Sequence, residues 1–212
     1  MNAPSPTSVV FIVDDDTSFL KSAARLLRAS GYPVRTFESA KGFLDQLSSE
    51  MAGCVVADLQ MPGMNGLELQ EALHKTANPL PVIFLSGQGD IPTTVRAMRQ
   101  GAEDFLTKLA SKEKLLAAVR RALTRDAQER RQRERVRVLR ERFAALTGRE
   151  LEVLGHVVRG RLNKQIASDL GINVRTVKLH RTSLTRRLQV HSVAELTKLA
   201  EEAGLFKDER TG

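Results

Sequence analysis

Short apolar runs alternate with longer stretches in which apolar residues recur every three or four positions through the first 123 residues. The runs are rich in β-branched and aromatic residues, and they cover residues 9–13, 34–37, 54–57, 82–85 and 104–107. The helical patterns lie near residues 19–30, 40–47, 67–75, 92–100 and 112–123. This alternation indicates βαβ units with right-handed crossovers, and hence a doubly wound α/β domain with a five-stranded parallel sheet.

Polar residues stand where these strands end. With five strands the expected order is the flavodoxin-like 2-1-3-4-5, which sets the first and third strands side by side. The first strand is followed by Asp14, Asp15 and Asp16, and the third ends at Asp58. Ligands collect at the carboxyl ends of strands in open α/β sheets. We therefore expect Asp14, Asp15 and Asp58 to share one pocket.

The chemistry of this pocket follows from its charges. Three close carboxylates repel one another, and a divalent cation with oxygen ligands, for which Mg²⁺ is suited, relieves that repulsion. The fourth strand leads to Ser86 and the fifth to Lys108, which add a hydroxyl and an ammonium able to bind a phosphoryl group. The set predicts a phosphoryl-transfer site with Asp58 as the nucleophile. Taken singly, each residue has a plainer alternative: a helix cap for Asp14 or Asp16, a turn for Ser86, a solvated charge for Lys108.

Residues 120–142 lack proline and glycine and are rich in Arg, Gln, Glu and Ala, which predicts a helix. Ala127 is the only apolar residue between Leu123 and Val136, so a solvated, charged spacer is expected. The alternatives are a signalling coiled coil and additional phosphate contacts to DNA. Apolar residues that recur further along are expected to pack on the next domain or on a second copy; they are Val136, Leu139, Phe143 and Leu146.

The segment from Thr147 onward predicts a set of short helices. Thr147-Gly-Arg-Glu150 is a capping box that opens the first of them. Two further helices follow, separated by Gly171. Ala167, Gly171 and Val177 have the spacing at which two helices pack across a tight turn, as in a DNA-binding helix-turn-helix.

The helix after this turn has an apolar stripe and a basic, polar face. Val177, Leu184 and Leu188 form the stripe and are expected to face the core. The other face suits insertion into the major groove of DNA. The residues expected at bases are Lys178, Leu179 and Thr182, those expected at phosphates are Lys164, Arg175, Arg181 and Arg186, and Thr176 belongs to the same DNA-binding set. For each of them, a solvated surface residue is the alternative.

The net charge of +8 is unevenly distributed: residues 1–119 carry −2, residues 120–142 carry +6 and residues 143–212 carry +4. A basic second half indicates a polyanion partner, and nucleic acid is favoured because no basic amphipathic surface helix is evident. No apolar run approaches the roughly 18 residues of a membrane helix, and the first residues lack the parts of a signal peptide, so a cytoplasmic protein is expected. The single Cys54 is expected to be a buried hydrophobe.

Residues 9–123 resemble the receiver domain of bacterial two-component response regulators. The matching residues are Val13-Asp-Asp-Asp16, Asp58-x-x-Met-Pro-Gly-Met-Asn-Gly, Ser86-Gly and Lys108. Two stretches, Ser86-Gly-Gln-Gly-Asp-Ile-Pro-Thr-Thr-Val-Arg-Ala-Met and Gly101-Ala-x-Asp-Phe-Leu, are similar to the FixJ branch in particular.

This resemblance implies roles for single residues. Asp58 would accept phosphate from a histidine kinase. Mg²⁺ would be held by Asp15, Asp58 and the backbone carbonyl of Gln60, with Asp14 acting through water. Ser86 and Phe105 would be the switch pair, which follows the phosphoryl group inward. The face made by the fourth helix and the fifth strand would then become a dimer surface, and the residues on it here are Ile91, Val95 and Arg99.

The chain departs from the family after its lysine. Receivers usually have proline there, often after a cis bond, whereas this chain has Lys108-Leu109. A cis bond before a residue other than proline costs about 2.5–4 kcal/mol, so we expect a trans bond and some displacement of the loop, which leaves the direction of Lys108 open.

Residues 143–203 resemble the LuxR-type helix-turn-helix domain. The matching motifs are Leu146-Thr-x-Arg-Glu-x-Glu-Val-Leu, Asn163-Lys-Gln-Ile-Ala, Leu170-Gly-Ile, Arg175-Thr-Val-Lys-x-His-Arg and Ala194-Glu-Leu. In that family a fourth helix, here residues 192–202, dimerises the domain on a two-fold DNA site. Gln189 stands where glycine is usual before this helix, and a slightly tighter turn is expected there.

These features predict a receiver domain over residues 1–123, a basic helical linker over 124–142 and an all-α, four-helix DNA-binding domain over 143–212. The predicted function is a transcription factor, similar to FixJ-type regulators, which forms a homodimer when a histidine kinase phosphorylates it. It would bind double-stranded promoter DNA, work with RNA polymerase, and catalyse only its own phosphorylation and dephosphorylation.

Two alternatives stay open. One is a phosphohydrolase of the haloacid-dehalogenase type, with Asp14 as nucleophile in Asp14-x-Asp16. The other is a DNA-binding protein whose receiver is not phosphorylated and serves only for dimerisation.

Overall fold

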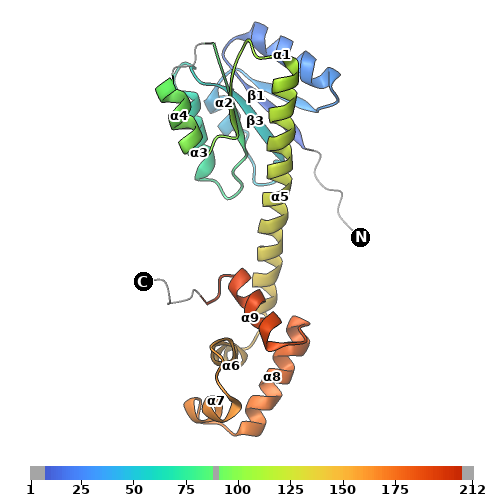
Figure 1. Cartoon of the computed structure of the whole chain (residues 1–212), viewed down its shortest axis with the longest axis vertical. Helices are drawn as coiled ribbons and strands as arrows, with labels where there is room; N and C mark the ends of the chain where they lie inside the picture. Colours follow the sequence, from blue (N-terminus) through green and yellow to red (C-terminus); the bar gives the residue numbers. More distant parts are fainter. Residues whose placement is uncertain (1–7, 88–90, 207–212) are drawn as a thin grey trace. The chain divides into compact units, whose positions relative to one another are not determined.

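The computed structural model of the chain describes residues 8–87 and 91–206. It divides into two compact units, Met1–Arg130 and Arg131–Gly212. Figure 1 shows that the first unit is built from a sheet and helices, and that the second is helical. Within the described residues, none of the helices combines the length and the apolar character that spanning a membrane requires.

A parallel sheet forms the centre of the first unit. Its strands are β1 (Val9–Val13), β2 (Val34–Phe37), β3 (Gly53–Asp58), β4 (Val82–Ser86) and β5 (Asp104–Thr107). They lie in the order β2-β1-β3-β4-β5 and are all parallel, which confirms the predicted doubly wound sheet. Val13 at the end of β1 lies opposite Ala57 of β3. The residues that follow these two strands therefore leave the sheet at the same edge.

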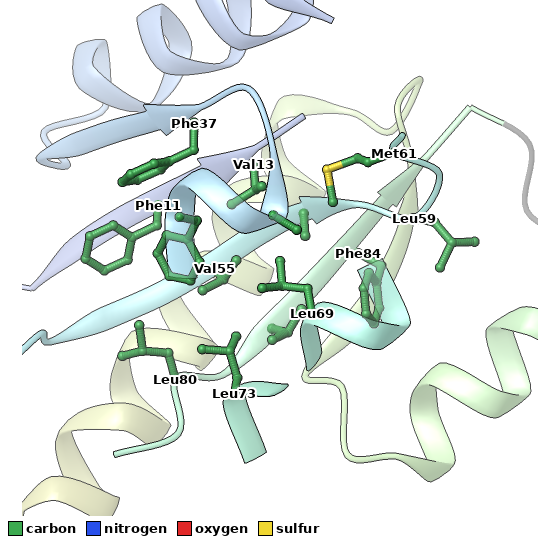
Figure 2. Close-up of a cluster of buried hydrophobic side chains, with 14 of the residues drawn as sticks. Phe11, Val13, Phe37, Val55, Leu59, Met61, Leu69, Leu73, Leu80 and Phe84 are labelled. Carbon is green, nitrogen blue, oxygen red and sulfur yellow. The ribbon is translucent and has the colours of Figure 1, made fainter. Parts of the chain in front are cut away.

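Helices cover both faces of this sheet. They are α1 (Thr17–Ala29), α2 (Ala40–Leu44), α3 (Gly66–His74), α4 (Ile91–Arg99) and the first part of α5 (Lys112–Ala144). Because successive side chains of a strand point to opposite faces, β1 serves two cores. Phe11 and Val13 pack with residues of α2 and α3, in the core shown in Figure 2, whereas Val10 and Ile12 pack with residues of α1 and α5.

Two of the predicted helices differ in extent from the observed ones. The pattern at residues 40–47 predicts one helix, but α2 ends at Leu44. The amides of Gln46 and Leu47 bond to carbonyls three residues back, each at 3.1 Å, which is the spacing of a turn and not of an α-helix. The stretches 112–123 and 120–142 form a single helix, α5, because no proline or glycine interrupts them.

The second unit consists of α6 (Gly148–Val158), α7 (Asn163–Asp169), α8 (Val174–Leu188) and α9 (Val193–Glu202), together with the end of α5. The predicted stripe on α8 is buried in its core, and so are Leu139, Phe143 and Leu146. Gly171 lies between α7 and α8 at φ +60°, a left-handed conformation that suits glycine. The predicted packing of two helices across a tight turn is confirmed.

A buried carboxylate joins α6 to α8. The Glu150 side chain accepts hydrogen bonds from the Ser183 hydroxyl at 2.7 Å and from the Thr147 amide and hydroxyl at 2.9 Å each. Arg187 on α8 lies 3.6 Å away. The hydrogen bond from Ser183, followed by that from the Thr147 amide, holds the pKa of Glu150 at about 2. The ionised carboxylate therefore stabilises the folded state.

Replacing Glu150 by Gln should lower the free energy of unfolding at pH 7 by about 2 kcal/mol, because hydrogen bonds to a charged group are lost. The pKa of Glu150 is lower in the folded chain than the ordinary 4.5, so its contribution is complete above pH 4.5 and disappears as the pH falls toward 2. Urea unfolding followed by circular dichroism should show the two proteins converging over that range. Glu152→Gln, which removes an exposed carboxylate, is the control; a constant difference at all pH values would contradict this account.

The turn after α8 contains a residue in an unfavourable conformation. Gln189 is the C-cap of α8 and has φ 55° and ψ 45°, the left-handed region. Among the described residues it is the only one other than glycine with a positive φ. This is the position at which LuxR-type domains usually have glycine, and the backbone keeps the conformation that glycine favours.

Replacing Gln189 by Gly should therefore stabilise the second unit. The left-handed conformation costs about 1–2 kcal/mol for a residue with a Cβ, and the greater entropy loss of glycine offsets about half of the gain, so we expect about 0.5–1 kcal/mol. Thermal unfolding of the full chain measures it. Gln128→Gly, at an exposed position inside α5, should instead destabilise, and equal shifts in both variants would exclude an effect of the left-handed turn.

Candidate functional site

The carboxyl edge of the sheet brings three carboxylates together. Asp14, Asp15 and Asp58 each place one oxygen within 4.8 Å of the others. Asp14 and Asp58 are buried, whereas Asp15 is exposed. The predicted shared pocket is therefore present. Asp16 is not part of it, because its side chain accepts the amides of Ser18 and Phe19 as the N-cap of α1.

Lys108 lies among these acids. Its ammonium is 2.7 Å from Asp14 Oδ2 and 2.9 Å from Asp58 Oδ2, and it lies 4.7 Å from the centre of the Phe19 ring. The bond to Leu109 is trans, as expected, and Leu109 is 93% exposed. The direction of Lys108, which the sequence leaves open, is toward the acids: its ammonium contacts both Asp14 and Asp58.

The cluster has more negative than positive charge. Burial raises the pKa of Asp14 above its ordinary value, and the hydrogen bond from Lys108 offsets this only in part. Burial would lower the pKa of Lys108, but its hydrogen bonds to Asp14 and Asp58 outweigh that effect and raise it. One ammonium faces three carboxylates. Such a group of hard oxygen ligands with an excess of negative charge fits Mg²⁺.

The other residues predicted for this region lie around the cluster. Ser86 is buried at the end of β4, and its carbonyl accepts the Lys108 amide at 2.9 Å. Phe105 is partly buried on β5, with its ring centre 6.2 Å from that of Phe84. The Gln60 amide lies 3.4 Å from Asp58 Oδ1. Residues 88–90 of the predicted motif after Ser86 lie outside the described residues.

An exposed apolar surface lies on α4 near this edge. Ile91 is 79% and Val95 42% exposed, and Arg99 is exposed beside them. Met98, which is 45% exposed, adds to this surface and was not predicted. Its spacing from Val95 and Ile91, three and seven positions along one helix, is the signal that could have identified it.

The predicted DNA-binding residues lie on and around α8 in the second unit. Most of them are exposed; this group is Lys164, Arg175, Lys178, Leu179, Thr182 and Arg186. Thr176 and Arg181 are partly buried, and Arg181 donates to the Asn163 side chain at 2.8 Å. An open hollow of about 460 Å³ lies between Leu162, Asn163, Lys178, Arg181 and Thr182. The sequence analysis missed Leu162 and Asn163, whose positions at the start of α7 place them beside α8.

Arginines of the linker segment are engaged within the chain. Arg137 pairs with Glu134 and Glu141 on the same helix. Arg135 pairs with Glu202, and Arg140 donates to the Ala203 carbonyl at 3.0 Å, both at the end of α9. These contacts favour the charged spacer over a helix whose arginines are reserved for DNA phosphates.

Comparison with known proteins agrees with the geometry of both units. Residues 10–120 match the family model described as the response regulator receiver domain, and residues 144–200 match that of bacterial regulatory proteins of the luxR family. The response regulator protein TodT of Pseudomonas putida is 42% identical over 194 residues, covering 92% of this chain and 86% of TodT. The transcriptional regulatory protein FixJ of Azorhizobium caulinodans is 40% identical over 196 residues, covering 92% of this chain and 93% of FixJ.

Solved structures give the same result. The response regulator StyR is similar over 92% of this chain and 99% of its own, with 44% identity and a TM-score of 0.81. Full-length FixJ from B. japonicum is similar over 94% of this chain and 98% of its own, with 33% identity and a TM-score of 0.55. This chain therefore belongs to the two-component response regulators that join a receiver domain to a LuxR-type DNA-binding domain, and it is a transcription regulator of that family.

Proposed function

We propose that this response regulator is switched by phosphorylation of Asp58 by a partner histidine kinase, and that phosphorylation promotes dimerisation and promoter binding. The observation that carries the proposal is the position of Asp58. It is buried at the carboxyl edge of β3, beside two further carboxylates and 2.9 Å from the Lys108 ammonium.

The residues of the site fit phosphoryl transfer to this carboxylate. An oxygen of Asp58 attacks the phosphorus of a phosphohistidine, the P–N bond breaks as the P–O bond forms, and the imidazole leaves after taking a proton. Lys108 lies where its charge can bind an oxygen of the transferred group, with the Ser86 hydroxyl as a further donor. Mg²⁺ would be held by Asp15, Asp58 and the Gln60 carbonyl, with Asp14 through water, and would neutralise charge on the phosphoryl oxygens.

Phosphorylation at this edge of the sheet would change the structure of the α4 surface. Inward movement of Ser86 toward the phosphoryl group would leave space for the Phe105 ring, whose centre lies 6.2 Å from that of Phe84. The change would favour a dimer through the exposed surface of Ile91, Val95 and Arg99, where association removes apolar area from water. Two joined DNA-binding domains then bind adjacent half-sites, and the affinity of the pair for DNA exceeds that of either domain alone. RNA polymerase is a further partner expected of a transcription factor.

Sedimentation of the full chain with Mg²⁺, before and after addition of beryllofluoride as a phosphoryl mimic, tests the switch. The wild type should shift from monomer toward dimer, and Asp58→Asn should remain a monomer because it lacks the anionic oxygen that binds the mimic. If neither protein responds, the receiver serves only for dimerisation or as a spacer, and this proposal is wrong.

The same variants separate the response regulator from the phosphohydrolase alternative. Labelling with a radioactive small phosphodonor should fail for Asp58→Asn and persist, at a reduced rate, for Asp14→Asn. The opposite result would make Asp14 the nucleophile.

The assignment of base and phosphate contacts has its own test. A duplex selected by the wild type with beryllofluoride from a randomised pool serves as specific DNA. Lys178→Ala or Leu179→Ala should cost about 1–3 kcal/mol on this duplex but little on a scrambled one, because base contacts carry sequence preference. Arg186→Ala should weaken both equally and reduce the slope of affinity against salt by about one unit.

Lys114→Ala, which removes an exposed lysine of the first unit, is the charge-matched control for these variants. Equal losses on both duplexes for Lys178→Ala and Leu179→Ala would remove them from the base contacts.

A further inference from the structure

A fully buried carboxylate lies in the middle of α5, where the sequence predicts a solvated spacer. Asp126 has 0% of its surface exposed. It belongs to the first unit, four residues before that unit ends at Arg130. The phosphoryl-transfer site does not use Asp126. This residue contacts the amino end of β3, whereas Lys108 and the acids lie at the carboxyl end of the strands. Burying a charge is costly unless it is paired and hydrogen-bonded, so its partners show what it does.

The first partner is the strand that carries Asp58. Asp126 Oδ2 accepts the backbone amide of Gly53 at 2.9 Å, and Gly53 is the first residue of β3. Every residue of β3 is buried, from Gly53 to Asp58. Only glycine fits at the start of this strand, because a Cβ on residue 53 would collide with the Val9 carbonyl. Asp58 and the Asp126 contact are thus at opposite ends of one buried strand.

The second partner is one turn further along α5. Arg130 Nε lies 2.8 Å from the same oxygen, Asp126 Oδ2, and only 22% of the Arg130 side chain is exposed. The apolar packing of α5 on the sheet ends at Leu123, beyond which Ala127 is the only apolar residue before Val136. Hydrophobic contact therefore accounts for α5 as far as Leu123. Polar contacts hold the segment 124–130: the exposed ion pair of Arg125 with Glu103 at 3.5 Å, and the buried contacts of Asp126.

We propose that Asp126 is a positioning residue that fixes α5 to the receiver as far as Arg130, and so sets the length of linker through which receiver dimerisation acts on DNA binding. The first residue of α5 buried in the second unit is Leu139. Before Leu139, Arg135 already pairs with Glu202, so with the Asp126 contact residues 131–134 lie between the two anchored parts of the helix. Without it, the last contact of α5 with the first unit is the ion pair between Arg125 and Glu103, and the free stretch begins at residue 126.

The functional consequence concerns DNA affinity, because the affinity gained by joining two DNA-binding domains depends on the length and stiffness of the segment that links them. A helical segment without tertiary packing is only marginally stable in water. When such a segment lengthens and loosens, the effective concentration of one linked module near the other falls with about the −3/2 power of its length. Lengthening the free stretch from 131–134 to 126–134 should then reduce the gain in DNA affinity on dimerisation by about threefold, and more if stiffness is also lost. This inference rests on the proposed function for its effect on DNA, but not for the anchoring itself.

The anchoring is tested by hydrogen exchange of the full chain. In the wild type, the amides of residues 124–130 should be protected to a degree similar to those of 112–123. Asp126→Ala should accelerate exchange at 124–130 by about tenfold or more and leave 112–120 nearly unchanged. Asp126→Asn keeps the volume and an acceptor for the Gly53 amide but loses the charge opposite Arg130, and it should give an intermediate result. It also keeps the test decisive if the alanine variant does not fold.

The coupling is tested with the same variants, on the duplex selected by the wild type. Beryllofluoride should still dimerise Asp126→Asn, because the receiver site and the α4 surface are intact, but its gain in DNA affinity should fall by at least about threefold. Glu141→Gln is the matched control: it removes an ion pair with Arg137 on the same helix, where the Glu141 side chain is 62% exposed. It should leave exchange and DNA affinity as in the wild type.

Unchanged exchange at 124–130 in both Asp126 variants would overturn the proposal, and so would a full affinity gain despite faster exchange. A wild type that does not respond to beryllofluoride would contradict the proposed function instead, and the exchange result would still decide whether Asp126 anchors the helix.

Discussion

Repulsion among carboxylates at one edge of a parallel sheet is the constraint around which the first unit is built. Parallel pairing of β1 with β3 brings Asp14, Asp15 and Asp58 to the same place, where one oxygen of each lies within 4.8 Å of the others. Lys108 relieves part of the repulsion by contacting two of the three acids. The remaining negative charge would be relieved further by a bound cation, because an opposite charge nearby favours the ionised carboxylates. The sheet supplies the stability that tolerates this local cost.

The sequence predicts features that depend on local pattern. The strand order follows from the alternation of five strands with helices, the acid cluster follows from strands that end in acids, and the helix-turn-helix follows from the spacing of Ala167, Gly171 and Val177. The site residues could be named in advance because strand ends converge in this class of sheet. Where prediction failed at an element's limit, as in the last turn of α2, local hydrogen bonding decided the outcome.

Features that depend on distant partners were not predictable. The sequence pattern predicts Asp126 to be an exposed charge on a solvated helix, because its partner Gly53 is 73 residues away in the sequence. The sequence pattern correctly predicts Glu150 to be part of a capping box. Its hydrogen bond from Ser183, 33 residues away, was not predictable. The absence of proline leaves the direction of Lys108 open in the sequence, and the structure places its ammonium against two buried acids. In each case a charged side chain with little exposed surface is paired with a residue far away in the sequence, and such a pair cannot be predicted from the local pattern.

The start of β3 has a consequence for how sequence variation in such a protein is interpreted. Position 53 lies far from the acids and takes no part in their chemistry, yet only glycine fits beside the Val9 carbonyl while presenting its amide to Asp126. A survey of tolerated substitutions would therefore rank Gly53 with Asp58, at the other end of the same strand. On the proposed function, intolerance at the two positions has different origins: steric exclusion at Gly53 and acceptance of the phosphoryl group at Asp58. Only replacements that preserve the fold, such as Asp58→Asn, distinguish a residue that reacts from one that merely has no room to change.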